Sequence, residues 1–167
     1  MIFRIIIFLF FLLFFYLGLN RLEYTDDEKT YLAILNYNSE NIRDFTLHAL
    51  SYSSNISHLI LMKISGSYFN LIKFFFLFSS WILLDKEFKH KGLQFRKLFP
   101  FFLFPYFFIS GTLLRDDLIV AIVLLIVYVS LKYENKVKYI YFLILLTVLF
   151  YTRFYWALII LASIIFL

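Results

Sequence analysis

Residues 98–131 read LFPFFLFPYFFISGTLLRDDLIVAIVLLIVYVSL, a run of 34 residues whose charged side chains are Arg115, Asp116 and Asp117. As one helix the run would be about 51 Å long at 1.5 Å per residue, whereas the hydrocarbon core of a bilayer is roughly 30 Å thick. We therefore expect two antiparallel spans, Leu98–Leu114 and Leu118–Tyr133, that turn at the charges. The run predicts an all-α membrane fold.

The composition of the whole chain supports this prediction. Of the 167 residues, 63% are hydrophobic and 16% are charged, against roughly 45–50% and about 25% in ordinary soluble domains. A soluble enzyme, a disordered tail and a collagen-like chain are excluded, because a globule of this size could not bury so much apolar surface. The absence of cysteine excludes a disulfide framework, a thiolate metal site and a cysteine nucleophile.

Four further apolar stretches predict spans. The first, Ile5–Leu19, lacks the small-residue cleavage pattern of a signal peptide, and the second, Ser67–Leu84, contains a lysine. The last two, Tyr139–Tyr151 and Phe154–Leu167, are separated by Thr152 and Arg153. One tilted span is an alternative there, but an arginine facing lipid at mid-span would be costly. We expect a polytopic bundle of about six transmembrane helices.

The distribution of charge predicts the orientation. With a cytoplasmic N-terminus, the inside segments hold nine basic and three acidic residues, and the outside segments hold six basic and eight acidic residues. Short basic loops remain in the cytoplasm, so this orientation also explains the net charge of +5 and removes the main support for nucleic-acid binding. The basic residues assigned to the inside are Arg4, Lys86, Lys89, Lys91, Arg96, Lys97, Lys132, Lys136 and Lys138.

The domain organisation is simple. We expect residues 1–167 to form a single transmembrane domain with an outer loop at Asn20–Gly66. Within that loop, residues 42–50 and Ile56–Ile64 show helical spacing of apolar side chains, which predicts short amphipathic helices on the membrane surface. Because the sequence ends within the apolar run ALIILASIIFL, we expect the N-terminal part of a longer protein.

An acidic cluster opens the outer loop. Thr25 and Glu28 have the spacing of a capping box, with Asp26 and Asp27 in the first helical turn between them. One interpretation is a well-capped surface helix. The other is a catalytic carboxylate just outside the membrane, which would take the proton of an attacking sugar hydroxyl.

Three cations lie within or between apolar segments. Arg115 and Arg153 each separate two apolar halves on the outer side. They could be interfacial anchors, with Arg115 paired to a neighbouring aspartate, or they could hold a lipid-linked phosphate through the bidentate guanidinium. Lys73, inside a span, could extend to the membrane surface or make a third phosphate contact.

Other chemistry lacks sequence support. The chain has no P-loop, no GxGxxG motif, no His–Glu zinc helix and no GxSxG elbow. His48 and His58 are ten residues apart without ligand-spaced partners. We expect no metal and no cofactor.

The arrangement resembles that of a known group of proteins. Phe104-Pro105, Ser110, Arg115-Asp116 and the isolated Tyr151-Thr152-Arg153 resemble bacterial O-antigen and exopolysaccharide repeat-unit polymerases. This resemblance implies a protein of the bacterial inner membrane that joins sugar units linked to undecaprenyl pyrophosphate on the outer face. It also implies that Arg115 and Arg153 hold the pyrophosphate.

The acidic segment has a second resemblance. Tyr24–Tyr31 is similar to the first outer loop of GT-C glycosyltransferases, in which an acidic residue is the base. That role would fall to Asp26, Asp27 or Glu28. We therefore expect membrane-embedded glycosyl transfer or polymerisation from a polyprenyl-linked saccharide. The alternatives are a lipid-linked sugar transporter or flippase, and a non-enzymatic membrane subunit or inactive fragment.

Overall fold

The computed structural model describes residues 2–20, 25–35, 56–93, 97–112, 114, 116–133, 137–152 and 157–161, and in these parts all secondary structure is helical. The all-α prediction is confirmed. The elements are α1 (Ile2–Leu19), α2 (Asp26–Leu35), α4 (Ile56–Ser65), the 3₁₀ helix η1 (Gly66–Tyr68), α5 (Phe69–His90), the 3₁₀ helix η3 (Phe99–Leu103), α6 (Phe104–Ser110), α7 (Asp116–Lys132) and α8 (Val137–Thr152).

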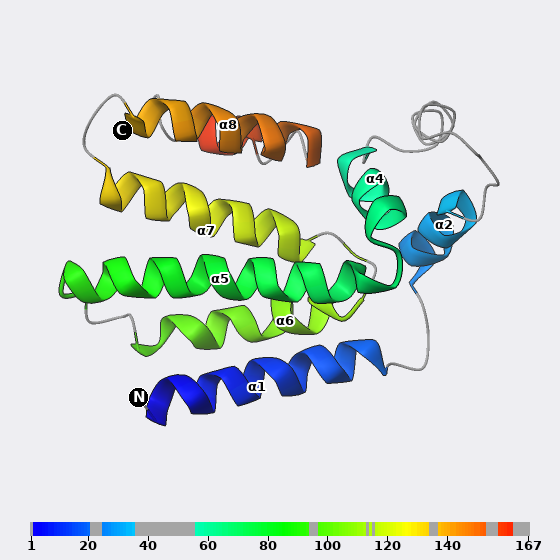
Figure 1. Cartoon of the computed structure of the whole chain (residues 1–167), viewed down its shortest axis with the longest axis horizontal. Coiled ribbons are helices and arrows are strands. Elements are labelled where there is room, and N and C mark those ends of the chain that lie inside the picture. Colours follow the sequence, from blue (N-terminus) through cyan, green and yellow to red (C-terminus); the bar gives the residue numbers. More distant parts are fainter. Residues whose placement is uncertain are drawn as a thin grey trace.

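The longer helices lie side by side and alternate in direction (Figure 1). Helix α6 lies between α1 and the closely packed pair α5 and α7, and α8 packs on the far side of α7. Helices α2 and α4 lie together at the end of the bundle where α1 and α6 finish and α5 and α7 begin. We call this the α2 end. The opposite end, where α5 and α7 finish, is called the basic end.

Aromatic side chains fill the space between α1, α5 and α6. The ring of Phe11 in α1 stacks on Phe107 in α6, with centroids 3.8 Å apart, and meets Trp81 in α5 edge-on at 5.2 Å. Phe74 in α5 lies 4.8 Å from Phe15 in α1. Rings of this size bury large apolar areas and prefer such stacked and edge-on contacts. These side chains fix how α1 sits against α5 and α6.

Helices α1 and α6 approach each other much more closely than ring packing alone allows. A Cβ atom on Gly18 would meet the carbonyl oxygen of Phe108 and would lie 3.2 Å from the Cα of Gly111. A Cβ on Gly111 would lie 2.7 Å from the backbone nitrogen of Leu19. Small residues permit this backbone contact between helices. The two glycines therefore set the crossing of α1 and α6.

The predicted turn at the charged residues is present. Helix α6 ends at Ser110 and α7 begins at Asp116 in the opposite direction. At the other end of the run, Pro100 and Pro105 occupy the first turns of η3 and α6, positions where a missing N–H is tolerated. The 34-residue run is thus a helical hairpin.

Some helix limits differ from the expected spans. Helix α5 continues from the apolar segment through Asp85 to His90, where the prediction ended it at Leu84. The charged residues that follow Leu84 are still helical, because polar side chains do not by themselves end a helix. The helix ends just before Gly92, whose φ of 68° allows the backbone to turn. Helix α6 ends four residues before Leu114, because Gly111 and Thr112 already form a turn there.

The C-terminal described segment folds back on the bundle. Residues 157–161 are helical, and Ala157 is buried with Leu149 of α8 and Ile122 of α7. Leu161 lines one groove with Lys138 and Tyr139 at the start of α8. This contact favours the hairpin after α8 over a single tilted span.

In the described part of the chain, fewer helices than the six predicted spans are long and apolar enough to cross a membrane. Among the described residues one continuous helical segment, Ile60–His90, is long and apolar enough to cross a membrane. Ile5–Leu19, Phe99–Ser110 and Lys138–Phe150 are apolar but shorter.

Candidate functional site

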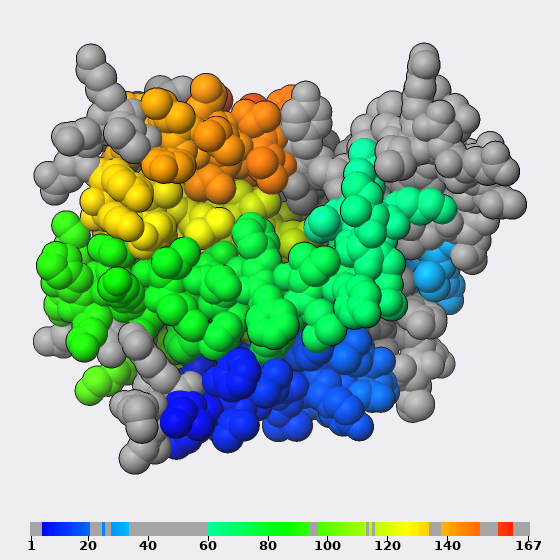
Figure 2. Space-filling view, viewed as in Figure 1, coloured from blue at the N-terminus to red at the C-terminus, as the bar shows by residue number. Residues whose placement is uncertain are grey.

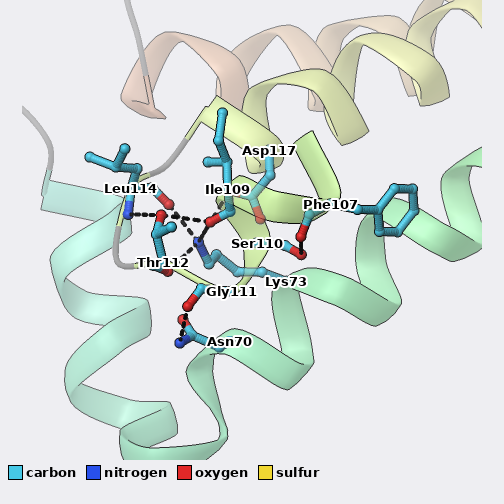
Figure 3. Close-up of polar contacts among 9 residues, drawn as sticks. All are labelled: Asn70, Lys73, Phe107, Ile109, Ser110, Gly111, Thr112, Leu114 and Asp117. Carbon is cyan, nitrogen blue, oxygen red and sulfur yellow. Dashed lines mark hydrogen bonds and ion pairs between the residues drawn. The ribbon is translucent and has the colours of Figure 1, made fainter. Parts of the chain in front are cut away.

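A buried lysine at the α2 end is the centre of the most extensive polar network in the described part of the chain (Figure 3). Lys73 lies in the second turn of α5, and its side chain and that of Asp117, in the first turn of α7, are both 0% exposed. The Nζ atom of Lys73 lies 3.2 Å from Oδ1 of Asp117, with which it forms an ion pair. The two charges are 44 positions apart and are joined by the packing of α5 on α7.

The same ammonium group also holds the turn between α6 and α7. Lys73 donates hydrogen bonds to the carbonyl oxygens of Thr112 at 3.0 Å, Leu114 at 2.5 Å and Ile109 at 3.4 Å. Its Nζ lies 5.0 Å from the centre of the Phe69 ring, within cation–π range. The carbonyl groups freed at the end of α6 thus find a charged donor in place of water.

Side chains of the turn complete the network. Thr112 donates its hydroxyl to the carbonyl oxygen of Ile109 and accepts the N–H of Leu114, and Asn70 donates to the carbonyl oxygen of Gly111. Within the described residues, Oδ2 of Asp117 and Oδ1 of Asn70 are buried and receive no hydrogen bond. Since an unsatisfied buried acceptor is costly, these two oxygens offset part of the stabilisation that the network provides.

The buried position of Lys73 contradicts the predicted extension of its side chain to the membrane surface. Its ammonium does not extend to the surface, because Asp117 and three carbonyl groups are within reach inside the bundle. A phosphate contact by Lys73 stays a prediction, and it would require a phosphate to displace these acceptors. As described, Lys73 fixes the residues on both sides of Arg115: Leu114 through its carbonyl oxygen and Asp117 through its carboxylate.

The predicted capping box is present at the start of α2. Oε2 of Glu28 accepts the backbone N–H of Thr25 at 2.9 Å and its hydroxyl at 3.1 Å, while the N–H of Glu28 donates to Oγ1 of Thr25 at 3.4 Å. Glu28 is 0% exposed. The carboxylate of Glu28 therefore stabilises the first turn of α2, as the structural interpretation expects. A catalytic role for Asp26, Asp27 or Glu28 stays a prediction.

The remaining candidate side chains lie outside the described residues. Asp26 and Asp27 form the beginning of α2, but only their backbone is described. Arg115 and Arg153 are not described, and neither is the predicted helix at 42–50. The convergence of the two arginines on one pocket stays a prediction. In the described ranges, no group of three His, Asp or Glu side chains could hold a metal ion.

Sequence reasoning missed Asp117 as the partner of Lys73. It assigned Asp116 or Asp117 to Arg115, the nearest cation along the chain. The available signal was positional, since Lys73 and Asp117 each lie near the same end of neighbouring antiparallel helices, and a charge inside an apolar bundle needs a partner. Asn70, one turn before Lys73, was a further indication of a polar face.

Comparison of the chain with protein-family models, with curated proteins and with solved structures finds no match.

Proposed function

We propose that the chain is a polytopic membrane protein that transfers or polymerises glycosyl units from a polyprenyl-(pyro)phosphate-linked sugar at the α2 end of its bundle. The observation that carries this proposal is the separation of the two ends. The acidic start of α2 and the turn held by Lys73 lie at one end, and the described lysines around the end of α5, the segment just before η3, the end of α7 and the start of α8 lie at the other.

The outer surface of the bundle supports membrane embedding. Soluble monomers rarely expose contiguous apolar patches larger than a few hundred Å². Helix α1 exposes large apolar side chains along its length, and so does α8. These side chains are Ile5, Ile6, Leu9, Phe10, Leu13 and Leu17 in α1, and Ile140, Leu143, Ile144, Val148 and Phe150 in α8. The interior, by contrast, contains an ion pair. Apolar side chains outside and paired charges inside suit a lipid environment.

The ends of the bundle support the proposed orientation. The described cations near the ends of α5 and α7 and the starts of the following helices gather at the basic end, which would face the cytoplasm. They are Lys86, Lys89, Lys91, Lys97, Lys132 and Lys138. The α2 end would then lie at the outer face of the inner membrane, where lipid-linked sugars are assembled into polysaccharide.

The chemistry proposed for this end has two parts. A carboxylate of Asp26, Asp27 or Glu28 accepts the proton of an acceptor hydroxyl while the hydroxyl oxygen bonds to the anomeric carbon. The bond from that carbon to the phosphate oxygen breaks, and the polyprenyl (pyro)phosphate leaves with the electron pair. Arg115 and Arg153 would bind this leaving group in bidentate fashion and stabilise its growing charge. Lys73 holds Leu114 and Asp117, which lie on either side of Arg115 in the sequence. A binding group next to a fixed backbone would support this role, because preorganised donors need no rearrangement during the reaction.

Neutral variants of the acids test the base. Glutamine at position 28 can still accept the N–H of Thr25, so Glu28→Gln preserves the capping contact and removes the base. We expect one of Asp26→Asn, Asp27→Asn and Glu28→Gln to slow polysaccharide assembly by about 10²–10⁴-fold, the usual contribution of a general base. The measurement is the yield and chain length of surface polysaccharide in cells in which the variant replaces the natural chain.

The controls separate the mechanisms. Lys29→Gln changes an exposed neighbour in the same helix and should leave the yield unchanged. Arg115→Lys and Arg153→Lys keep the charge but lose the bidentate geometry, so each should shorten the polysaccharide. Full yield from all the acid variants would exclude the GT-C mechanism and leave the polymerase mechanism. Full yield from both arginine variants as well would overturn the proposed function.

A further inference from the structure

A basic cleft lies at the opposite end of the bundle from the candidate site. It has a volume of about 430 Å³ and lies between the last turns of α5 and α7, which are neighbours at the left of the space-filling view (Figure 2). Three lysines and one glutamate give it a net charge of +2 with the histidine neutral. Its lining residues are Lys86, Glu87, His90, Lys91, Leu131 and Lys132.

The lysines of this cleft are not used to cap the helix. At the end of α5 the backbone N–H groups of Lys91, Gly92 and Leu93 donate to the carbonyl oxygens of Glu87, Lys89 and Phe88. Three of the last four carbonyls of α5, a kind of group that often attracts lysine side chains, thus already have backbone donors. Within the described part of the chain, neither Lys86 nor Lys91 forms an ion pair. Their charge is available to an anion.

Lys132 is held in place for such a ligand. Its Nζ donates to the hydroxyl of Tyr128 at 2.6 Å and lies 5.1 and 5.2 Å from the ring centres of Tyr128 and Tyr133. An ammonium group has three donors, so two remain after the bond to Tyr128. Because the side chain is already ordered, less conformational entropy is lost when an anion binds.

Apolar side chains continue from the cleft toward the middle of the bundle. Ile82 lies one turn before Lys86 on α5, and Val127 lies one turn before Leu131 on α7. Both are large apolar side chains exposed to the surroundings, at 40% and 37%. A ligand with a negative head and apolar chains would match both parts of this surface, whereas a free anion would use only the cleft.

We propose that the cleft between the ends of α5 and α7 binds the phosphate headgroup of an anionic phospholipid. Basic pockets between helices at the cytoplasmic face of a membrane recognise such headgroups. The lipid phosphate accepts hydrogen bonds from Lys86, Lys91 and Lys132, and its acyl chains lie along the exposed apolar side chains of α5 and α7. The proposal shares membrane embedding and the cytoplasmic position of the basic end with the proposed function, and it does not depend on glycosyl transfer.

Native mass spectrometry of the full chain released from detergent tests this site. Phosphatidylglycerol and phosphatidylcholine with the same acyl chains are added, and the bound lipids are counted. We expect the wild type to prefer phosphatidylglycerol. The double variant Lys86→Gln/Lys132→Gln should bind it roughly thirtyfold more weakly, from the usual contribution of each lysine near a membrane surface. Tyr128→Phe should weaken binding by a smaller factor, because it removes only the hydroxyl that holds Lys132.

The matched control is Lys89→Gln, which removes an exposed lysine of the same turn that does not line the cleft. It should change the affinity by less than about threefold, since it acts only through screened long-range charge. Equal binding of the two lipids by the wild type, or an equal loss in Lys89→Gln and the double variant, would overturn the site. Displacement of phosphatidylglycerol by millimolar inorganic phosphate would overturn the lipid assignment in favour of a free anion.

Discussion

The substitution Lys73→Met is expected to destabilise the bundle by about 3–5 kcal/mol, the usual cost of removing one partner of a buried ion pair. It leaves the carboxylate of Asp117 in the interior without its cation and removes the donor of the Thr112 and Leu114 carbonyl groups. The free energy of unfolding can be measured by denaturant titration of the detergent-solubilised protein, followed by the fluorescence of its tryptophans.

Two further variants identify the cause of that loss. Lys63→Met makes the same change at an exposed lysine of α4 and should alter the stability by less than about 0.5 kcal/mol, as surface changes usually do. The double variant Lys73→Met/Asp117→Leu removes the stranded carboxylate and should recover part of the loss, because apolar replacements of buried ion pairs are often neutral. A double variant less stable than Lys73→Met alone would contradict the ion-pair explanation.

The second large effect is expected at the crossing of α1 and α6. In Gly18→Ala the new methyl group meets the backbone carbonyl of Phe108, which cannot move aside as a flexible side chain could. We expect a loss of about 3 kcal/mol, at the upper end of the range for overpacked sites. The same denaturant titration measures it.

The neighbouring residue provides the control for this crossing. Leu17 is 48% exposed, so Leu17→Ala should have little effect on folding. Gly111→Ala should resemble Gly18→Ala, because its methyl group meets the backbone of α1 from the other side. Wild-type stability in both glycine variants would show that α1 and α6 are not in backbone contact.

The sequence predicts the features of this fold that depend on neighbouring residues. The hairpin around Asp116 follows from the length of the apolar run, and the capping box of Thr25 and Glu28 follows from their spacing. Both are seen in the structure. The end of α5 was placed too early, because hydropathy marks the limit of the apolar segment and not the limit of the helix.

Contacts between distant positions were beyond the same reasoning. The pairing of Lys73 with Asp117 and the contact of Gly18 with Gly111 depend on which helix faces which, and on rotation about each helix axis. Neither is encoded in local spacing. Lys73 was recognised as unusual, but its role in holding the α6–α7 turn required the packing of α5 on α7.

Membrane embedding with the α2 end outside is tested most directly by labelling in sealed, right-side-out membrane vesicles. The chain has no cysteine, so Lys29→Cys in α2 and Lys89→Cys at the end of α5 each introduce a unique thiol at an exposed position. A membrane-impermeant maleimide should label Lys29→Cys in intact vesicles and should label Lys89→Cys only after the vesicles are opened. Labelling of both variants in intact vesicles, or recovery of the chain in the aqueous fraction without detergent, would contradict it.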